Sequence, residues 1–291
     1  MELKLKDEEF TRLVSFMRNN YGINLIKKRV LIEGRLSHIV QQGGFTDYTS
    51  YLNSVFNDKS GKELATLVNK LTTNHTYFLR EPEHFEYMKQ VVLPHIEATV
   101  KDRDARIWCA ASSSGEEPYT IAMVIDEYFG NKKKNWDLRI LATDVSTTVL
   151  QKAETGIYTE ESVSTLPAHW RTKYFTKISS DSYQISDDIR KEVVFKQFNL
   201  MDNIVNKKPY DLIFCRNVMI YFEGDTKTSL IERFFDVTKD GGYLFIGHAE
   251  SIPRNSCYTY IKPAVYQKQK DKMQDSLRQS AIHYNNDYEI Y

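Results

Sequence analysis

The sequence has few cysteines and no net charge, and both shortages exclude classes of protein. Only three of its 291 residues are cysteine (Cys109, Cys215 and Cys257), and no two of them form a CxxC pair. Neither a disulfide framework nor a zinc site is therefore indicated, and no metal site is expected. The 39 Lys and Arg residues balance 39 Asp and Glu residues. No overall field directs the chain to nucleic acid or membrane, so electrostatic recognition has to come from a local patch.

Long apolar runs are also missing. No run approaches the roughly 18 residues of a membrane span, and even the apolar stretch 211–222 is interrupted by Arg216 and Asn217. Residues 1–9 lack the apolar core of a signal peptide. Hydrophobic residues still make up 41% of the chain, as in ordinary globular proteins. These patterns predict a cytoplasmic globular protein without membrane insertion.

The first 70 or so residues have the periodicity of helices. Apolar residues recur near helical spacing, and we expect helices over 10–17, 30–40, 48–56 and 62–71. Gly22 and Gly43 interrupt this pattern, as residues at helix ends often do. No strand-like alternation occurs before residue 100, and the pattern predicts a small all-α domain over residues 1–72.

After residue 105 the pattern becomes that of an α/β domain. Short apolar runs alternate with helical stretches, and we expect strands over 106–110, 138–143, 193–198, 211–215 and 243–247. Strands separated by helices predict a parallel sheet that is covered on both faces. An alternating run at 257–267 is compatible with a strand that returns antiparallel to the sheet edge.

The domain boundaries follow from these patterns. A linker at 73–90 precedes the α/β domain at 91–268. Within that domain, alternation at 182–186 predicts a small β-subdomain over about 172–194. The polar residues 269–291 favour a mobile tail over a functional helix.

The first loop of the predicted sheet has an unusual composition. In open parallel sheets, ligands bind at the carboxyl ends of the strands. Small residues at 110–115 allow a ligand to approach the backbone closely, and Glu116 and Glu117 would attract a sulfonium or ammonium group and repel a pyrophosphate. The same acids would also complement the dipole of a helix starting beside Pro118. The loop alone favours neither interpretation.

Polar residues follow the next three strands as well. Asp144 ends the second strand, where a carboxylate can accept hydrogen bonds from a ribose diol, although a helix N-cap is the commoner role. Asn199 follows the third strand, and Arg216 and Asn217 follow the fourth. Together these residues favour a cationic ligand that bears a nucleoside. S-adenosylmethionine fits this description, whereas NAD and ATP fit badly because there is no phosphate cradle.

Five runs of residues resemble one known family. They are LTTNHTYFLRE at 71–81, SGEEPY at 114–119, ATD at 142–144, FCRNVMIYF at 214–222 and GHAES at 247–251. In this order, over about residues 10–268, they resemble the signature runs of the CheR family of chemotaxis receptor methyltransferases. Leu79 stands where the family usually has Phe, and Ala249 where it usually has Ser.

The resemblance implies a fold and an activity. The fold is a small all-α domain followed by a Rossmann-like α/β methyltransferase domain with a small inserted β-subdomain. The activity is O-methylation of glutamate side chains on the helical bundle of chemoreceptors, with S-adenosyl-L-methionine as cofactor and S-adenosyl-L-homocysteine as product. The cofactor residues implied are Asn74, Thr76, Arg80, Glu117, Asp144, Asn199, Leu200, Arg216 and Asn217, with Glu117 preferred to Glu116.

The resemblance also implies which residues act on the reacting groups. A glutamate carboxylate, with a reference pKa near 4.3, is ionised at neutral pH and needs no general base. The enzyme has to supply approach geometry and remove water from the carboxylate. Tyr221 is expected to orient the reacting groups by a hydrogen bond. Arg80 positions either the incoming carboxylate or the cofactor carboxylate, or it braces the linker.

Recognition of the protein substrate is expected in the helical domain. Residues 10–40 contain six basic residues and the single acid Glu33; the basic residues are Arg12, Arg18, Lys27, Lys28, Arg29 and Arg35. This patch would complement an acidic receptor face, with contacts from Lys28 and Arg35. Scattered solvated charges are the alternative. The loop at 177–182 is short and lacks glycine, so we expect a monomer that does not hold a receptor's C-terminal pentapeptide by strand addition.

Two other functions stay open at this point. A nucleic-acid methyltransferase could use the basic helices, but the chain has no Pro-Pro pair and therefore lacks the Asn/Asp-Pro-Pro-aromatic loop that methylates exocyclic amines. A non-catalytic adaptor that binds S-adenosylmethionine is disfavoured because every matched site residue is intact.

Overall fold

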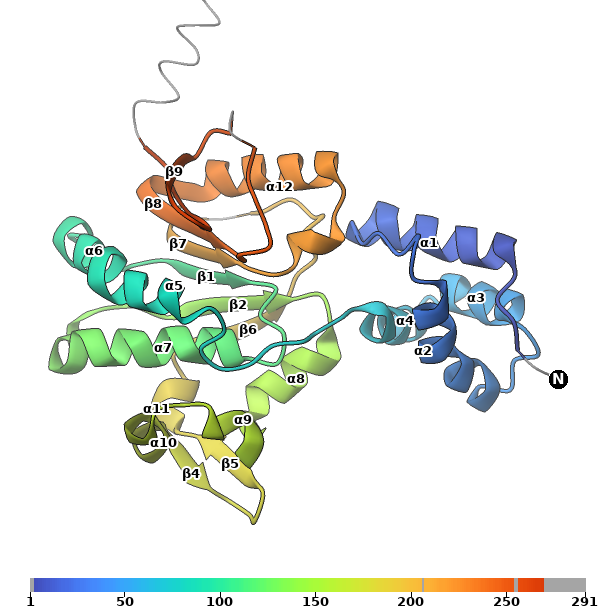
Figure 1. Cartoon of the computed structure of the whole chain (residues 1–291), viewed down its shortest axis with the longest axis horizontal. Helices are drawn as coiled ribbons and strands as arrows, with labels where there is room; N and C mark the ends of the chain where they lie inside the picture. Colours follow the sequence, from blue (N-terminus) through green and yellow to red (C-terminus); the bar gives the residue numbers. More distant parts are fainter. Residues whose placement is uncertain (1–2, 206, 254–255, 270–291) are drawn as a thin grey trace, which may run out of the picture.

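The computed structural model describes residues 3–205, 207–253 and 256–269. Within these residues, a helical unit at the amino end joins a larger α/β domain through an extended segment (Figure 1). The tail expected over 269–291 lies, apart from residue 269, outside the described residues. No helix in these ranges has the length and apolar character needed to cross a membrane.

The helical unit has a hydrophobic core of its own. It consists of α1 (Asp7–Tyr21), α2 (Arg29–Gln42), α3 (Tyr48–Asn57) and α4 (Lys62–Leu71). Apolar side chains at helical spacing, such as Leu13 and Met17 of α1 and Ile32 and Leu36 of α2, are buried in one cluster. The helices predicted from the apolar periodicity therefore form, and their apolar faces are what hold the unit together.

The main sheet positions the site. In the described residues its strand order is β6-β2-β1-β7-β8-β10-β9. The strands are β1 (Ile107–Ala110), β2 (Ile140–Asp144), β6 (Val193–Gln197), β7 (Tyr210–Cys215), β8 (Thr238–Ile246), β9 (Thr259–Lys262) and β10 (Val265–Gln267). The first five are parallel, and β10 is antiparallel to both β8 and β9. The predicted α/β fold class is confirmed.

Helices cover both faces of this sheet (Figure 1). The helices α5 (Pro82–Tyr87), α6 (Leu93–Thr99) and α7 (Glu116–Phe129) pack on one face, and α12 (Gly224–Val237) packs on the other. A π-helical turn, Met88–Val92, joins α5 to α6. Alternate residues of β7 pack on opposite faces of the sheet. Leu212 and Phe214 are buried in the hydrophobic core on the α7 side, and Ile213 and Cys215 in the core on the α12 side. This two-sided burial is why the strands are continuous apolar runs.

A small antiparallel sheet follows α8 (Thr147–Thr155). Its strand order is β3-β5-β4, and the strands are β3 (Ile157–Thr159), β4 (Phe175–Lys177) and β5 (Ser182–Ile185). The same part of the chain contains the short helices α9 (Glu160–Ser164), α10 (Ala168–Tyr174) and α11 (Asp187–Arg190). The β-subdomain was expected over about 172–194, but its sheet begins earlier. The first strand, β3, precedes residue 172 and pairs with β5. The Tyr174 hydroxyl joins the small sheet to α7 through hydrogen bonds to Asp126 and Glu127.

Candidate functional site

A pocket of about 300 Å³ lies where the parallel strands end. The strand order reverses direction at β1, between β2 and β7, which is the switch point at which open α/β sheets bind ligands. The loops after β1, β2, β6 and β7 line one side of the pocket. The segment around Asn24 and the start of α2 line the opposite side, and residues 71–76 lie between them.

Every residue predicted for the site lines this pocket. These residues are Lys28, Arg35, Asn74, Thr76, Arg80, Glu117, Asp144, Asn199, Leu200, Arg216, Asn217 and Tyr221. They come from both domains and from the segment that joins them. The fold thus brings the predicted residues together. They differ in how many of their hydrogen-bonding groups remain free for a ligand.

The loop after β1 is held in a conformation that side chains rarely adopt. Ala111 and Ser113 have φ values of 65° and 48°, and Gly115 has 97°. A Cβ atom on Gly115 would lie 2.7 Å from the Tyr158 hydroxyl, so only glycine fits there. The Ser113 hydroxyl donates to the Asn74 carbonyl at 2.9 Å, which ties the loop to the interdomain segment.

Asp144 is a buried carboxylate at the base of the pocket. It accepts hydrogen bonds from the backbone N–H groups of Ser113 and Ser146, each at 2.9 Å. Burial raises its pKa. The N-cap of α8 is Ser146, whose side chain accepts from Val149 N. Asp144 is therefore not a helix N-cap, and it lines the pocket.

The two adjacent acids Glu116 and Glu117 have different surroundings. The Glu116 side chain is buried away from the pocket, accepts from the Ser114 hydroxyl at 2.7 Å, and has a pKa that burial raises. Glu117 lines the pocket and accepts from the Cys109 thiol at 3.1 Å and from Arg216 Nη1 at 2.5 Å. Both acids lie in the first turn of α7, so the helix-dipole interpretation holds as well.

Arg216 is the centre of a buried network. Its side chain has 0% exposure, and Nη2 donates to Glu81 at 2.9 Å and to the Arg80 carbonyl at 2.5 Å. Burial alone would raise the pKa of Glu81, but the Arg216 charge and hydrogen bonds from Asn217 and Arg216 lower it to about 2. Arg216 thus connects the segment after β7 to residues 80–81 and to α7, a bracing role that was not predicted from the sequence.

The Arg80 guanidinium makes few contacts of its own. Its Nη1 donates to the His75 carbonyl at 2.9 Å, and its carbon lies 5.8 Å from the centre of the Tyr77 ring. Within the described residues no carboxylate forms an ion pair with it. The backbone on either side is strained, with φ values of 57° at Leu79 and 56° at Glu81. A cation that faces a pocket with unused donors is available to an anionic group.

Asn199 and Arg35 are more engaged than the sequence suggested. The Asn199 amide donates to the Asn20 carbonyl at 2.7 Å and accepts from Met201 N at 3.1 Å. Arg35 Nη1 donates to the carbonyls of residues 70, 71 and 72, which end α4. Both side chains therefore connect elements of the fold as well as lining the pocket.

Two of the six basic residues in the patch expected between residues 10 and 40 have acidic partners. Arg18 pairs with Glu223, and Arg29 pairs with Asp7 at 2.5 Å. Both acidic partners lie outside residues 10–40, so the composition of that segment does not reveal them. Among the described residues, the side chains of Lys27 and Lys28 have no hydrogen bond or ion pair, and only Lys28 of the two lines the pocket.

Two further residues of the site received no role from the sequence. The Glu250 carboxylate accepts from Gly247 N at 2.6 Å and from Asn217 N at 2.9 Å, and burial raises its pKa. A Cβ atom on Gly247 would lie 2.3 Å from Asn217 Nδ2, so the turn at Asn217 (φ 59°) requires this glycine. The run GHAES at 247–251 contained the signal, since an acid three residues after a glycine can accept from its N–H.

Residues 8–72 match the family model "CheR methyltransferase, all-alpha domain", and residues 74–266 match "CheR methyltransferase, SAM binding domain". A chemotaxis protein methyltransferase of Borreliella burgdorferi is 41% identical over 92% of this chain and 96% of its own length. Chemotaxis protein methyltransferase 2 of Vibrio cholerae is 36% identical, over 90% and 91%. A chemotaxis protein methyltransferase of Escherichia coli is 33% identical, over 92% and 93%.

Proposed function

The chain belongs to the CheR methyltransferase family, and on this premise we propose that it methylates glutamate side chains on the cytoplasmic helical bundle of chemoreceptors. The observation that carries the proposal is the meeting of the family's signature residues, from both domains, around one pocket. S-adenosylmethionine supplies the electrophilic methyl group, in keeping with the S-adenosylmethionine-binding domain that the chain contains. The product is S-adenosylhomocysteine.

The pocket has the chemistry to hold this cofactor. Asp144 has lone pairs left for ribose hydroxyls, and Glu117 provides negative charge beside a cationic ligand. The strained small-residue loop at 111–113 lets backbone groups approach the ligand. Leu200 offers an apolar surface to adenine, next to Asn199. Asn74, Thr76 and Asn217 complete the polar lining, and Arg216 holds Glu117 in place.

Two residues would act on the substrate carboxylate. Arg80 has unused donors toward the pocket and would orient and partly desolvate the incoming glutamate. The Tyr221 side chain lines the pocket from the 3-10 turn Met219–Tyr221 and would orient the reacting groups by a hydrogen bond. No side chain has to remove a proton, because the carboxylate is ionised at neutral pH.

The substrate would enter past the helical unit. Lys28 lines the pocket and is exposed, so it can meet an acidic receptor helix at the pocket mouth. Arg35 shapes that wall by binding the end of α4. We propose that the enzyme acts as a monomer without a pentapeptide tether. In support, the β4–β5 hairpin closes tightly, with Ile178 N donating to Ser182 O at 2.9 Å, and β4 is a short edge strand.

Methyl esters give the proposal a specific test. The protein is incubated with methyl-labelled S-adenosylmethionine and a receptor cytoplasmic fragment, and the product is treated with mild alkali. We expect label in the receptor that is released as methanol, because esters hydrolyse whereas methylated amines do not. Label in nucleic acid, or binding of S-adenosylmethionine without transfer, would favour the alternatives. Fragments with and without the terminal pentapeptide should be methylated equally.

A further inference from the structure

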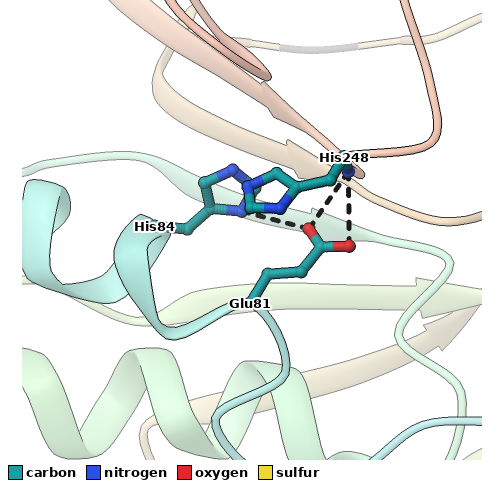
Figure 2. Close-up of side chains that lie close together, drawn as sticks. All are labelled: Glu81, His84 and His248. Atoms are coloured by element: carbon teal, nitrogen blue, oxygen red, sulfur yellow. Dashed lines mark hydrogen bonds and ion pairs between the residues drawn. The ribbon is translucent and has the colours of Figure 1, made fainter.

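A group of side chains with metal-binding chemistry lies outside the cofactor pocket. Glu81 and His84 come from the start of α5, and His248 follows β8 (Figure 2). One possible ligand atom from each lies within 4.8 Å of the others. None of the three lines the cofactor pocket. No spacing in the sequence indicates this group, because Glu81 and His84 are separated from His248 by most of the α/β domain.

His84 is unusual for a buried histidine. Its side chain is 0% exposed, yet neither ring nitrogen has a hydrogen-bond partner in the described part of the chain. An imidazole always carries at least one N–H group. Burying such a group without a partner costs free energy, and each case in a native structure requires an explanation. A ligand ion bound to Nδ1 would use the lone pair of that nitrogen, so that only the N–H group, then on Nε2, would be without a partner.

The separation of His84 and Glu81 fits two ligands of one ion. His84 Nδ1 lies 3.5 Å from Glu81 Oε2, which is long for a charge-assisted hydrogen bond. Two ligands of a tetrahedral zinc ion, with bonds of about 2.0–2.2 Å, are about 3.3–3.5 Å apart. The exposed His248 ring has to move by roughly 1.5 Å at most to join them, which rotation about its side-chain torsions provides.

We propose that Glu81, His84 and His248 bind one divalent transition-metal ion of the zinc class. Two imidazoles and one carboxylate suit such an ion, whereas magnesium and calcium prefer oxygen ligands alone. The exposure of His248 gives the ion access from solvent and leaves a coordination position for water. The bound ion would fasten the start of α5 to the segment after β8.

The affinity is set by competition for Glu81. Its Oε2 also accepts from Arg216, and its Oε1 accepts from Asn217 Nδ2 and His248 N. The Arg216 charge opposes a second cation nearby. We therefore expect weaker binding than at a permanent structural metal centre. The alternative is that the two histidines only pack as an aromatic pair, with ring centres 4.7 Å apart.

Cobalt(II) absorption tests this proposal on the full-length, untagged protein. Cobalt replaces zinc in such sites, and a tetrahedral cobalt ion has strong visible bands. Every sample carries Cys257→Ser, because this partly exposed thiol could bind cobalt by itself. His248→Ala removes one exposed ligand and leaves the buried core intact. His169→Ala, which removes an exposed histidine elsewhere, is the matched control.

The parent protein and His169→Ala should each bind one cobalt ion with tetrahedral bands, and zinc should displace it. His248→Ala should weaken binding by roughly tenfold or more, since one of three protein ligands is lost. Binding of metal should also raise the melting temperature of the parent but not of His248→Ala. The proposal is overturned if no saturable tetrahedral spectrum develops, or if His248→Ala binds as tightly as His169→Ala.

Discussion

The two sides of the cofactor pocket are built in different ways. The sheet side, formed by the loops after β1, β2 and β7, is held by buried carboxylates and by Arg216, which has no exposed side-chain surface. The helical side belongs to a unit with its own core, and it meets the α/β domain through polar contacts such as Asn24 N to the Tyr221 carbonyl and Arg18 to Glu223.

Because of this difference, the two sides of the pocket suit different roles. The buried network of the sheet side fixes the groups that we propose to contact the cofactor, because moving one of them leaves a charge or an N–H unpaired. Contacts of the helical side such as Arg18 with Glu223 are partly exposed and cost less to rearrange. The helical side is thus suited to adjust to a protein substrate while the sheet side stays rigid.

The largest effect should come from Arg216→Ala. Removing it leaves Glu117 and Glu81 as unpaired, mostly buried acids, which should lower the free energy of unfolding by about 3–5 kcal/mol. The matched variant on the other side is Arg18→Ala, which breaks an exposed ion pair and should cost about 0–1 kcal/mol. Urea unfolding measures both. Equal losses would remove the distinction between the two sides.

Asp144→Ala should weaken binding of S-adenosylmethionine by roughly 1.5–3 kcal/mol, the range for hydrogen bonds to a charged group. Isothermal titration calorimetry on the folded variant gives this value. Glu116→Gln is the control, because Glu116 is a buried acid on the same edge of the sheet that does not line the pocket. Unchanged affinity in Asp144→Ala would contradict the role of Asp144.

Tyr221→Phe should lower kcat by roughly tenfold, the equivalent of one orienting hydrogen bond, with little change in cofactor affinity. Arg80→Ala should reduce kcat further, and Arg80→Lys should restore part of it if the charge contacts the substrate. Single-turnover methylation assays separate these steps from product release. Normal turnover in Tyr221→Phe would make its hydroxyl a bystander.

The smallest effect concerns the helical side. Lys28→Glu should raise KM for the receptor severalfold at low salt and spare cofactor affinity, because charges at an interface rim mainly change encounter. Lys27→Glu makes the same charge change one residue away from the pocket lining and should have less effect. If the two substitutions change KM equally, or if neither changes it, Lys28 does not contact the receptor.

Much of the site could be predicted from the sequence because it is carried by strand ends. Asp144 and Arg216 directly follow apolar runs that could only be buried strands, and parallel strands bring their carboxyl ends to one edge. The difference between Glu116 and Glu117 could not be predicted in the same way. Adjacent residues on a helix point in different directions, and only the position of α7 on the sheet decides which one meets the pocket.

The electrostatic partners were the least predictable feature. Arg18 pairs with Glu223, and Arg29 with Asp7, so the patch is less basic in space than it looks along the chain. Arg35 binds the end of α4, which no spacing in the sequence indicates. Charges interact over a few ångströms in space and not along the chain, so counting them within one segment overestimates a surface field.

The sequence by itself determined the α/β order of strands and helices, the α-helical amino-terminal unit and the family, because apolar periodicity and contiguous motifs are local properties of the chain. The tertiary structure alone decided which acid faces the pocket, that Arg216 is the centre of a buried network, and that Glu81, His84 and His248 meet. The physical reason is that a buried polar group is stabilised by whatever partner the fold places within hydrogen-bonding distance, and that partner can come from any point along the chain.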